Sequence, residues 1–316
     1  MSLTSTQTTR LLSFTALLVL LVAYFMPIWW VSLTAPNYPK DVFPDGIRIH
    51  FYFDGVKSGC QGTSIKKSEI YQGDLGDTRE TELRQQTVQS QGLDCVHEMN
   101  TINHYVGMYP INVGGPVERI LSAYFFGFFA VMLVAFAFPA RKTQIGILTA
   151  GFALVLAWLG IEQFGLGRLE QHLTLYHESA GTFFNEPAVI ARWTDTLRLA
   201  THIVMAALAG VMLFVLAGVW KSRAFSLLLA LIPALLPVFF VIDYAGWLWF
   251  FGHNLHPWGA FTVKAFMPTV FGEGKVAQFS TYSYPYIGYG LLLLVSALLL
   301  PAILLRRKAI REGEAG

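Results

Sequence analysis

Six long apolar segments constrain the fold of this chain more than any other feature. They lie at about 11–31, 120–139, 144–164, 197–220, 225–250 and 286–305. A helix needs roughly 20 apolar residues to cross the hydrocarbon core of a bilayer, and each segment is near or above that length. Charged residues make up 13% of the chain, against roughly 25% in soluble domains. The pattern predicts an all-α polytopic membrane protein with about six transmembrane helices.

The first apolar segment has two interpretations. A secretory signal peptide also begins with a basic residue and an apolar run, but small residues mark its cleavage site. Here the run ends in Pro27-Ile28-Trp29-Trp30, and paired tryptophans are typical of a membrane interface. We therefore predict a retained first transmembrane helix within residues 1–34.

Basic residues predict the orientation. They follow the second, fourth and sixth apolar segments, as Arg141-Lys142, Lys221-Ser222-Arg223 and Arg306-Arg307-Lys308. Lys and Arg are enriched in cytoplasmic loops, so both termini are predicted to be cytoplasmic. The main loops would then be periplasmic, in a bacterial inner (cytoplasmic) membrane.

Three regions are then expected on the outer face. Residues 35–117 are predicted to form a mixed, β-containing extracytoplasmic domain between the first two helices. The other two regions, loops 165–196 and 251–285, belong to the five-helix membrane bundle at 118–316. Aromatic residues and prolines in the 251–285 loop suggest a re-entrant or interfacial cap.

The 35–117 region has three internal features. Arg48–Phe53 is β-rich and is followed by the turn residues Asp54-Gly55, so we expect strands there. Lys66–Gln91 is rich in Gln, Glu and Thr and is predicted to be a helical or loose insertion. The two cysteines, Cys60 and Cys95, are expected to form a disulfide because both would lie outside the cytoplasm.

Candidate metal ligands gather directly before the second apolar segment. They are His97, Met99, His104 and Met108, and imidazole with thioether suits copper, especially Cu(I). Ordinary packing is the alternative. His253, in the 251–285 loop, is a further candidate ligand, and His256 follows three residues later, but Pro257 favours a turn that leaves the ligand geometry open.

Ionisable residues near the outer ends of the apolar segments form a second candidate group. They are Glu162, Asp195, Arg198, His202 and Asp243. Charged groups in apolar spans usually face a bundle interior or a wet cavity, which predicts an outward-open polar vestibule. The alternative is a structural ion pair of Arg198 with Asp243 or Glu162.

Several function classes are excluded or disfavoured. No Cys-x-x-Cys-His motif for c-type haem occurs, and a b-type haem would need two intramembrane imidazoles where only His202 is suitably placed. Phosphate-binding-loop and hydrolase motifs are also missing. Without a basic patch we expect no nucleic-acid partner. A non-enzymatic role is predicted, and an enzymatic one is left open.

Three stretches carry a resemblance to a known family. They are Pro27-x-Trp29-Trp30 with Leu33-x-Ala35-Pro36-x-Tyr38-Pro39, then Asn103–Met108, then Gly252–Leu255 with Phe266-x-Pro268 and Gly272. Together they resemble polytopic membrane proteins found in nitrous-oxide-reductase gene clusters (NosB-like), over about half of the chain. In that family's pattern an acidic residue is common where His256 stands, so no role is assigned to His256.

The resemblance implies an accessory subunit in nitrous oxide respiration. Such a subunit would handle copper, or support the assembly or electron supply of a periplasmic copper enzyme. A periplasmic or membrane protein would be its partner, and copper its cofactor. Two alternatives stay open, a quinol-linked membrane electron-transfer subunit and a membrane anchor that docks a larger complex.

Overall fold

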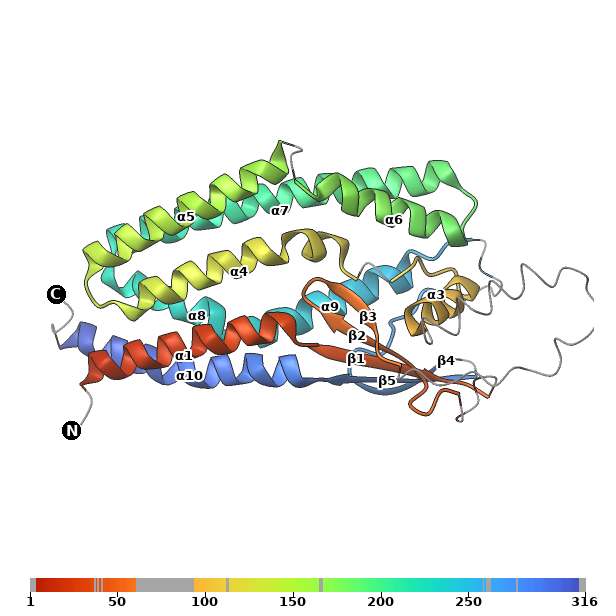
Figure 1. Ribbon diagram of the computed structural model, residues 1–316, viewed down its shortest axis with the longest axis horizontal. Coiled ribbons are helices and arrows are strands. Elements are labelled where there is room, and N and C mark those ends of the chain that lie inside the picture. Colours follow the sequence, from red (N-terminus) through yellow and green to blue (C-terminus); the bar gives the residue numbers. More distant parts are fainter. Residues whose placement is uncertain are drawn as a thin grey trace, which may run out of the picture.

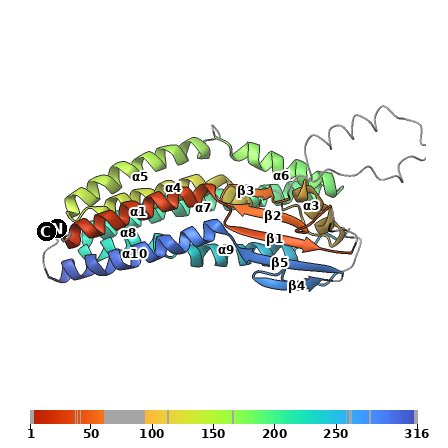
Figure 2. The ribbon, with the colours of Figure 1, turned by 60° about the horizontal axis from the view of Figure 1, so that its bottom comes forward.

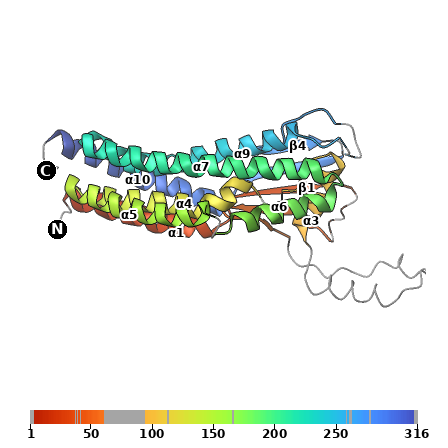
Figure 3. The ribbon, with the colours of Figure 1, turned by 90° about the horizontal axis from the view of Figure 1, so that it is seen from above.

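The computed structural model describes residues 4–36, 38, 40, 42–60, 94–111, 114–164, 167–257, 259, 263–276 and 278–312. The predicted insertion at Lys66–Gln91 lies outside these residues. The molecule is elongated, with a bundle of helices in one half and an antiparallel sheet in the other (Figure 1). Both chain ends lie at the helical end, away from the sheet (Figures 1 and 3).

Within the part of the chain that the structure describes, five helices are long and apolar enough to span a membrane. They are α1 (Ser5–Phe25), α4 (Pro116–Ala137), α5 (Arg141–Gln163), α7 (Pro187–Lys221) and α10 (Ile287–Arg311). A sixth candidate is broken. It joins the segment Arg223–Ala234, which ends in α8 (Leu228–Ala234), to α9 (Leu236–His253) across a 52° bend. The prediction of a mainly helical chain is thus confirmed, with five unbroken candidate spans, or six if the bent pair counts as one span.

Two prolines explain the bend between α8 and α9. Pro233 lies inside α8 and Pro237 in the first turn of α9, and proline both lacks an N–H and clashes with the preceding turn. The Ser296 hydroxyl of α10 donates to the Ala234 carbonyl at 2.7 Å. A neighbouring helix therefore satisfies a carbonyl at the break, as expected for prolines in a bundle.

The first helix ends earlier than its apolar run. α1 stops at Phe25, and Trp29–Thr34 forms strand β1, so the prediction of a helix continuing to Val31 within residues 1–34 is wrong. Pro27 cannot continue the helix, and Trp, Val and Thr favour a pleated strand. The Trp29 indole is buried and donates to the Ser283 hydroxyl at 2.9 Å.

The five-stranded sheet is built from two distant parts of the chain. Its order is β3-β2-β1-β5-β4, with β2 (Ile47–Tyr52), β3 (Gly55–Ser58), β4 (Gly272–Val276) and β5 (Phe279–Pro285). The strands expected around Arg48–Phe53 are confirmed. The 251–285 loop, expected as a cap, instead supplies β4 and β5. Strand β5 pairs with β1 and leads directly into α10 (Figure 2). Because α1 also packs against α10, the two chain segments stay side by side from the bundle into the sheet.

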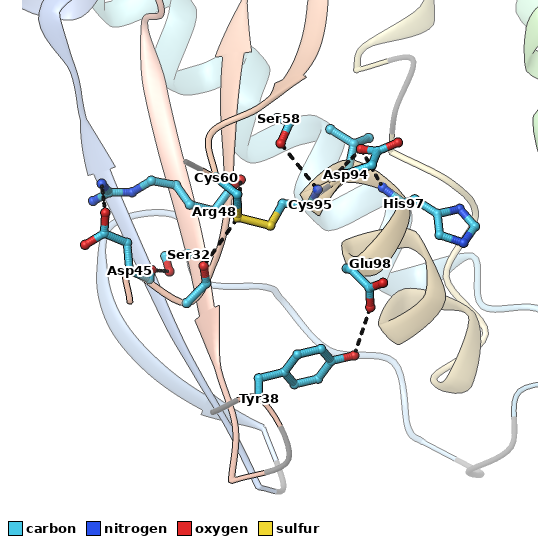
Figure 4. Close-up of a disulfide and its surroundings, with 12 residues drawn as sticks. Ser32, Tyr38, Asp45, Arg48, Ser58, Cys60, Asp94, Cys95, His97 and Glu98 are labelled. Carbon is cyan, nitrogen blue, oxygen red and sulfur yellow. Dashed lines mark hydrogen bonds and ion pairs between the residues drawn. A yellow bond between two sulfur atoms is a disulfide. The ribbon is translucent and has the colours of Figure 1, made fainter. Parts of the chain in front are cut away.

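The expected disulfide joins Cys60 to Cys95 and anchors helix α3 (Cys95–Tyr105) to the sheet (Figure 4). Asp94 caps α3 by accepting from the backbone N–H groups of Val96 and His97, at 3.0 and 3.2 Å. One face of α3 packs on the sheet through Met99 and Ile102. Strands β1–β5 with α3 are called the sheet module below.

Candidate functional site

A cavity of about 630 Å³ lies where the bundle meets the sheet module. It has the size of small-molecule sites in proteins, which usually have apolar walls and a few polar groups. Its wall comes from α1, α4, α7, α9, α3 and the sheet, and most of it is aliphatic or aromatic, including Leu20, Phe51, Ile102, Leu208, Phe240 and Trp247.

Two carboxyl groups face this apolar wall. Glu118 lies in the first turn of α4 and Asp243 in α9; both line the cavity, and the two carboxyl groups are close enough to interact electrostatically. Arg119 also lines the cavity. The mainly apolar wall therefore carries two neighbouring carboxyl groups and one guanidinium.

The Glu118 carboxyl keeps one acceptor available. Its Oε2 is buried and has no hydrogen-bond partner among the described residues. A Cβ built on Gly115 would lie 2.2 Å from this oxygen and 2.8 Å from the Trp247 indole nitrogen. The Glu118 carboxyl thus occupies the space that a side chain at Gly115 would fill.

A second polar contact crosses the wall between α1 and α4. The Tyr24 hydroxyl and the Ser122 hydroxyl lie 3.2 Å apart, and both residues line the cavity. Asn103 of α3 adds an amide to the lining. These groups offer donors and acceptors at separate points, which would orient a bound molecule without making the cavity polar.

The four candidate copper ligands near α3 fall on two faces. His97 and His104 both contact the Phe183 ring, at centroid distances of 6.0 and 5.9 Å. Met99 and Met108 instead line the cavity. Met99 belongs to the cluster that packs on the sheet, whereas Met108 packs in the cluster that contains Phe183 and Phe184. Among the residues that the structure describes, no group of three or more His, Cys, Asp or Glu is placed to hold a metal ion.

The two histidines of the 251–285 loop also diverge. His253 is exposed, stacks on Trp249 at 4.5 Å, and its Nδ1 lies 2.8 Å from the Trp249 carbonyl. His256 is buried, stacks on Phe184 at 4.3 Å, and lies 3.2 Å from a Glu186 carboxyl oxygen. Sequence reasoning missed this contact of His256 with Glu186.

The predicted vestibule residues are dispersed. Glu162 is buried and accepts from the backbone N–H groups of Arg168 and Leu169, at 2.8 and 3.1 Å, which stabilises the start of α6 (Leu169–Phe183). His202 Nδ1 lies 2.9 Å from the Gln163 side-chain oxygen. Of the five residues, only Asp243 lines the cavity.

Arg198 has partners other than those considered from the sequence. It pairs with Glu170 of α6 at 2.9 Å and with Asp195 of its own helix. The hydrogen bond from Arg198 holds the pKa of Glu170 below its usual range. This exposed cluster joins α6 to α7 and does not reach the cavity.

Sequence reasoning also missed Glu118. A usable signal was present, because Glu118-Arg119 follows Gly114-Gly115-Pro116 at the start of an apolar run, and ionisable residues there usually face a bundle interior or a wet cavity. No known protein family, curated protein or solved structure matches this chain. Its function is therefore inferred from the cavity and the sequence pattern.

Proposed function

We propose that this protein is an integral membrane protein that binds a quinol in the cavity between bundle and sheet module. The observation that carries the proposal is the Glu118–Asp243 pair in an apolar wall. Electron transfer is no part of the proposal, since it would need a redox partner as well.

Membrane insertion is supported by the surface of the candidate spans. Large apolar side chains are exposed along several helices, including Leu154, Leu199, Ile203, Phe214, Phe239 and Ile242. Extended apolar surface of this kind is usually covered by lipid or protein. We propose a bacterial inner membrane with both termini in the cytoplasm, so that the sheet module is periplasmic and available to a protein partner.

The chemistry of the wall favours a quinol headgroup. A quinol has hydroxyl groups that donate hydrogen bonds, and Glu118 Oε2 is an acceptor with no partner among the described residues. Trp247 and Phe251 add aromatic surface to the cavity wall. Val204, Leu208 and Val211 of α7 also line the cavity and suit an apolar tail. An oxidised quinone accepts hydrogen bonds but has no hydroxyl to donate.

The test compares a decyl-substituted benzoquinol with the matching benzoquinone by equilibrium binding in detergent micelles. The native protein is expected to prefer the quinol. Glu118→Gln and Asp243→Asn together are expected to weaken quinol binding roughly 10- to 100-fold, as for the loss of a hydrogen bond to a charged acceptor, and to leave quinone binding nearly unchanged.

A steric variant separates the site from the headgroup chemistry. Val204→Trp would fill part of the cavity from α7, on a different helix from either carboxyl group, and should weaken binding of both molecules. If Val204→Trp binds as the native protein does, the cavity is not the site. If Val204→Trp blocks binding but the carboxyl variants have no effect, the cavity binds an apolar molecule and the proposed role of the pair is wrong.

Copper handling, which the family resemblance implies, is a second proposal. The supporting observation is that Met99 and Met108 line one cavity, and paired thioethers favour Cu(I). We expect the purified protein to bind about one Cu(I) ion per chain. The double variant Met99→Leu, Met108→Leu should not bind it. His97→Ala with His104→Ala is the matched comparison: loss of Cu(I) there alone would place the ligands on the opposite face of α3. Protein that binds no copper would end this proposal.

A further inference from the structure

A second candidate site lies at the end of the bundle farthest from the sheet, where both chain ends lie (Figures 1 and 3). Residues 1–10, 139–146, 219–227 and 303–311 contain no Asp or Glu. The same stretches carry Arg10, Arg141, Lys142, Lys221, Arg223, Arg306, Arg307, Lys308 and Arg311. Glu312, which lies 3.8 Å from Lys308, and Glu314 follow directly after these stretches, so positive charge is in clear excess at this end.

Arg306 of α10 is the most unusual of these cations, because it is only 4% exposed. Its Nη2 donates to the Phe136 carbonyl at 2.8 Å, and its guanidinium lies 5.4 Å from the Phe136 ring centroid. Its Nε is buried and has no hydrogen-bond partner among the described residues. A buried charge of this kind is costly unless it is paired.

Arg306 lines a small pocket together with Arg141 and Arg223. Arg141 donates through Nε to the Val219 carbonyl at 3.0 Å, so two of the three arginines each bind a carbonyl at a helix end. A guanidinium has five N–H donors and no acceptor. Because Arg306 and Arg141 each bind one carbonyl, most of their N–H donors can bind other partners. No Asp or Glu is among the residues that line the pocket.

The geometry points to an anion: we propose that this pocket binds the phosphate of an anionic phospholipid from the cytoplasmic leaflet. The pocket holds about 10 Å³, room for about one water-sized atom, so one phosphate oxygen enters and the rest stays at the mouth beside the exposed Arg223. Arginine forks suit phosphate geometry, and basic pockets between helices on the cytoplasmic side are where lipid headgroups bind. This site is independent of the cavity, although a lipid source requires the proposed membrane insertion.

Native mass spectrometry of the full chain in detergent tests the site, with phosphatidylglycerol and phosphatidylcholine as probes at equal concentration. Native protein should retain phosphatidylglycerol preferentially. Arg223→Gln is expected to lower its occupancy roughly tenfold, the effect of losing one hydrogen bond between charged groups. Arg307→Gln is the control. Arg307 is exposed at the same end of the molecule but does not line the pocket, so its loss should leave the occupancy of phosphatidylglycerol almost unchanged.

Thermal unfolding provides a second readout, since a ligand that binds only the folded state raises the Tm. Phosphatidylglycerol should stabilise the native protein and the Arg307→Gln variant clearly more than Arg223→Gln or Arg306→Met. Equal losses in Arg223→Gln and Arg307→Gln would overturn the proposal, since they indicate diffuse attraction to charge. Inorganic phosphate that displaces the lipid or gives the same stabilisation would instead make free phosphate the ligand and overturn the lipid assignment.

Discussion

Replacing Cys60 and Cys95 together with serine is expected to lower the stability of the sheet module by roughly 3 to 4 kcal/mol. The disulfide closes a loop with a sequence separation of 35 residues, and a loop of that size restricts the unfolded chain by about this free energy. Helix α3 should open first, because the disulfide joins its first residue to the end of the β2–β3 hairpin. Hydrogen exchange of the α3 amides measures that opening.

The native protein after reduction serves as the control for the serine variant. Reduction should accelerate α3 exchange to the rate of the variant, while exchange in α5, remote from the disulfide, stays the same. Equal α3 exchange in the oxidised native protein and the variant would mean that other contacts hold α3. The contacts available for that role include the Cys95 backbone N–H donating to Ser58 and the Tyr38 hydroxyl donating to Glu98, at 3.3 and 3.4 Å.

Gly107→Ala is expected to destabilise the protein by about 2 to 4 kcal/mol, combining strain at positive φ with a steric clash. Gly107 has φ +81°, and an added Cβ would lie 2.4 Å from the His256 carbonyl oxygen. A hydrogen bond from the His256 backbone N–H to the Gly107 carbonyl, at 2.6 Å, joins the same two segments. The substitution would separate the end of α3 from the loop after α9. The resulting loss of stability is measured as a lower Tm.

Gly146→Ala is the matched control for Gly107→Ala. Gly146 lies within helix α5, and an added Cβ there meets no atom within 4 Å. Alanine should be neutral or stabilising by up to about 1 kcal/mol at such a position. Similar Tm values for the two variants would show that the chain at Gly107 relaxes, and that the tight contact with His256 contributes little to stability.

Some features of the fold could be predicted because they depend on short stretches of chain. The apolar runs identify helices of spanning length by composition alone. Pro233 and Pro237 predict a break wherever their helix packs, because the missing N–H is a property of the residue. The disulfide was predictable because only two cysteines occur. None of these inferences requires knowing which helices are neighbours.

The position of side chains around α3 could have been predicted in part. On a helix each residue advances by about 100°, so His97 and His104, seven positions apart, share a face that excludes Met99. The sequence was instead read as one ligand cluster because α3 was not recognised as a helix. Helix α3 begins after Asp94, and the stretch 61–93 before it shows no periodic pattern of apolar residues. The start of the helix was therefore not evident from the sequence.

The sequence by itself determined the apolar helices, the break at the two prolines and the disulfide, since each follows from local composition or from a count of residues. Tertiary structure alone decided that Trp29–Thr34 pairs with Phe279–Pro285, because strand partners far apart in sequence are selected by packing and register. It also decided that Glu118 meets Asp243. These carboxyls lie on helices that approach only when the whole bundle packs, so no local pattern could place them together.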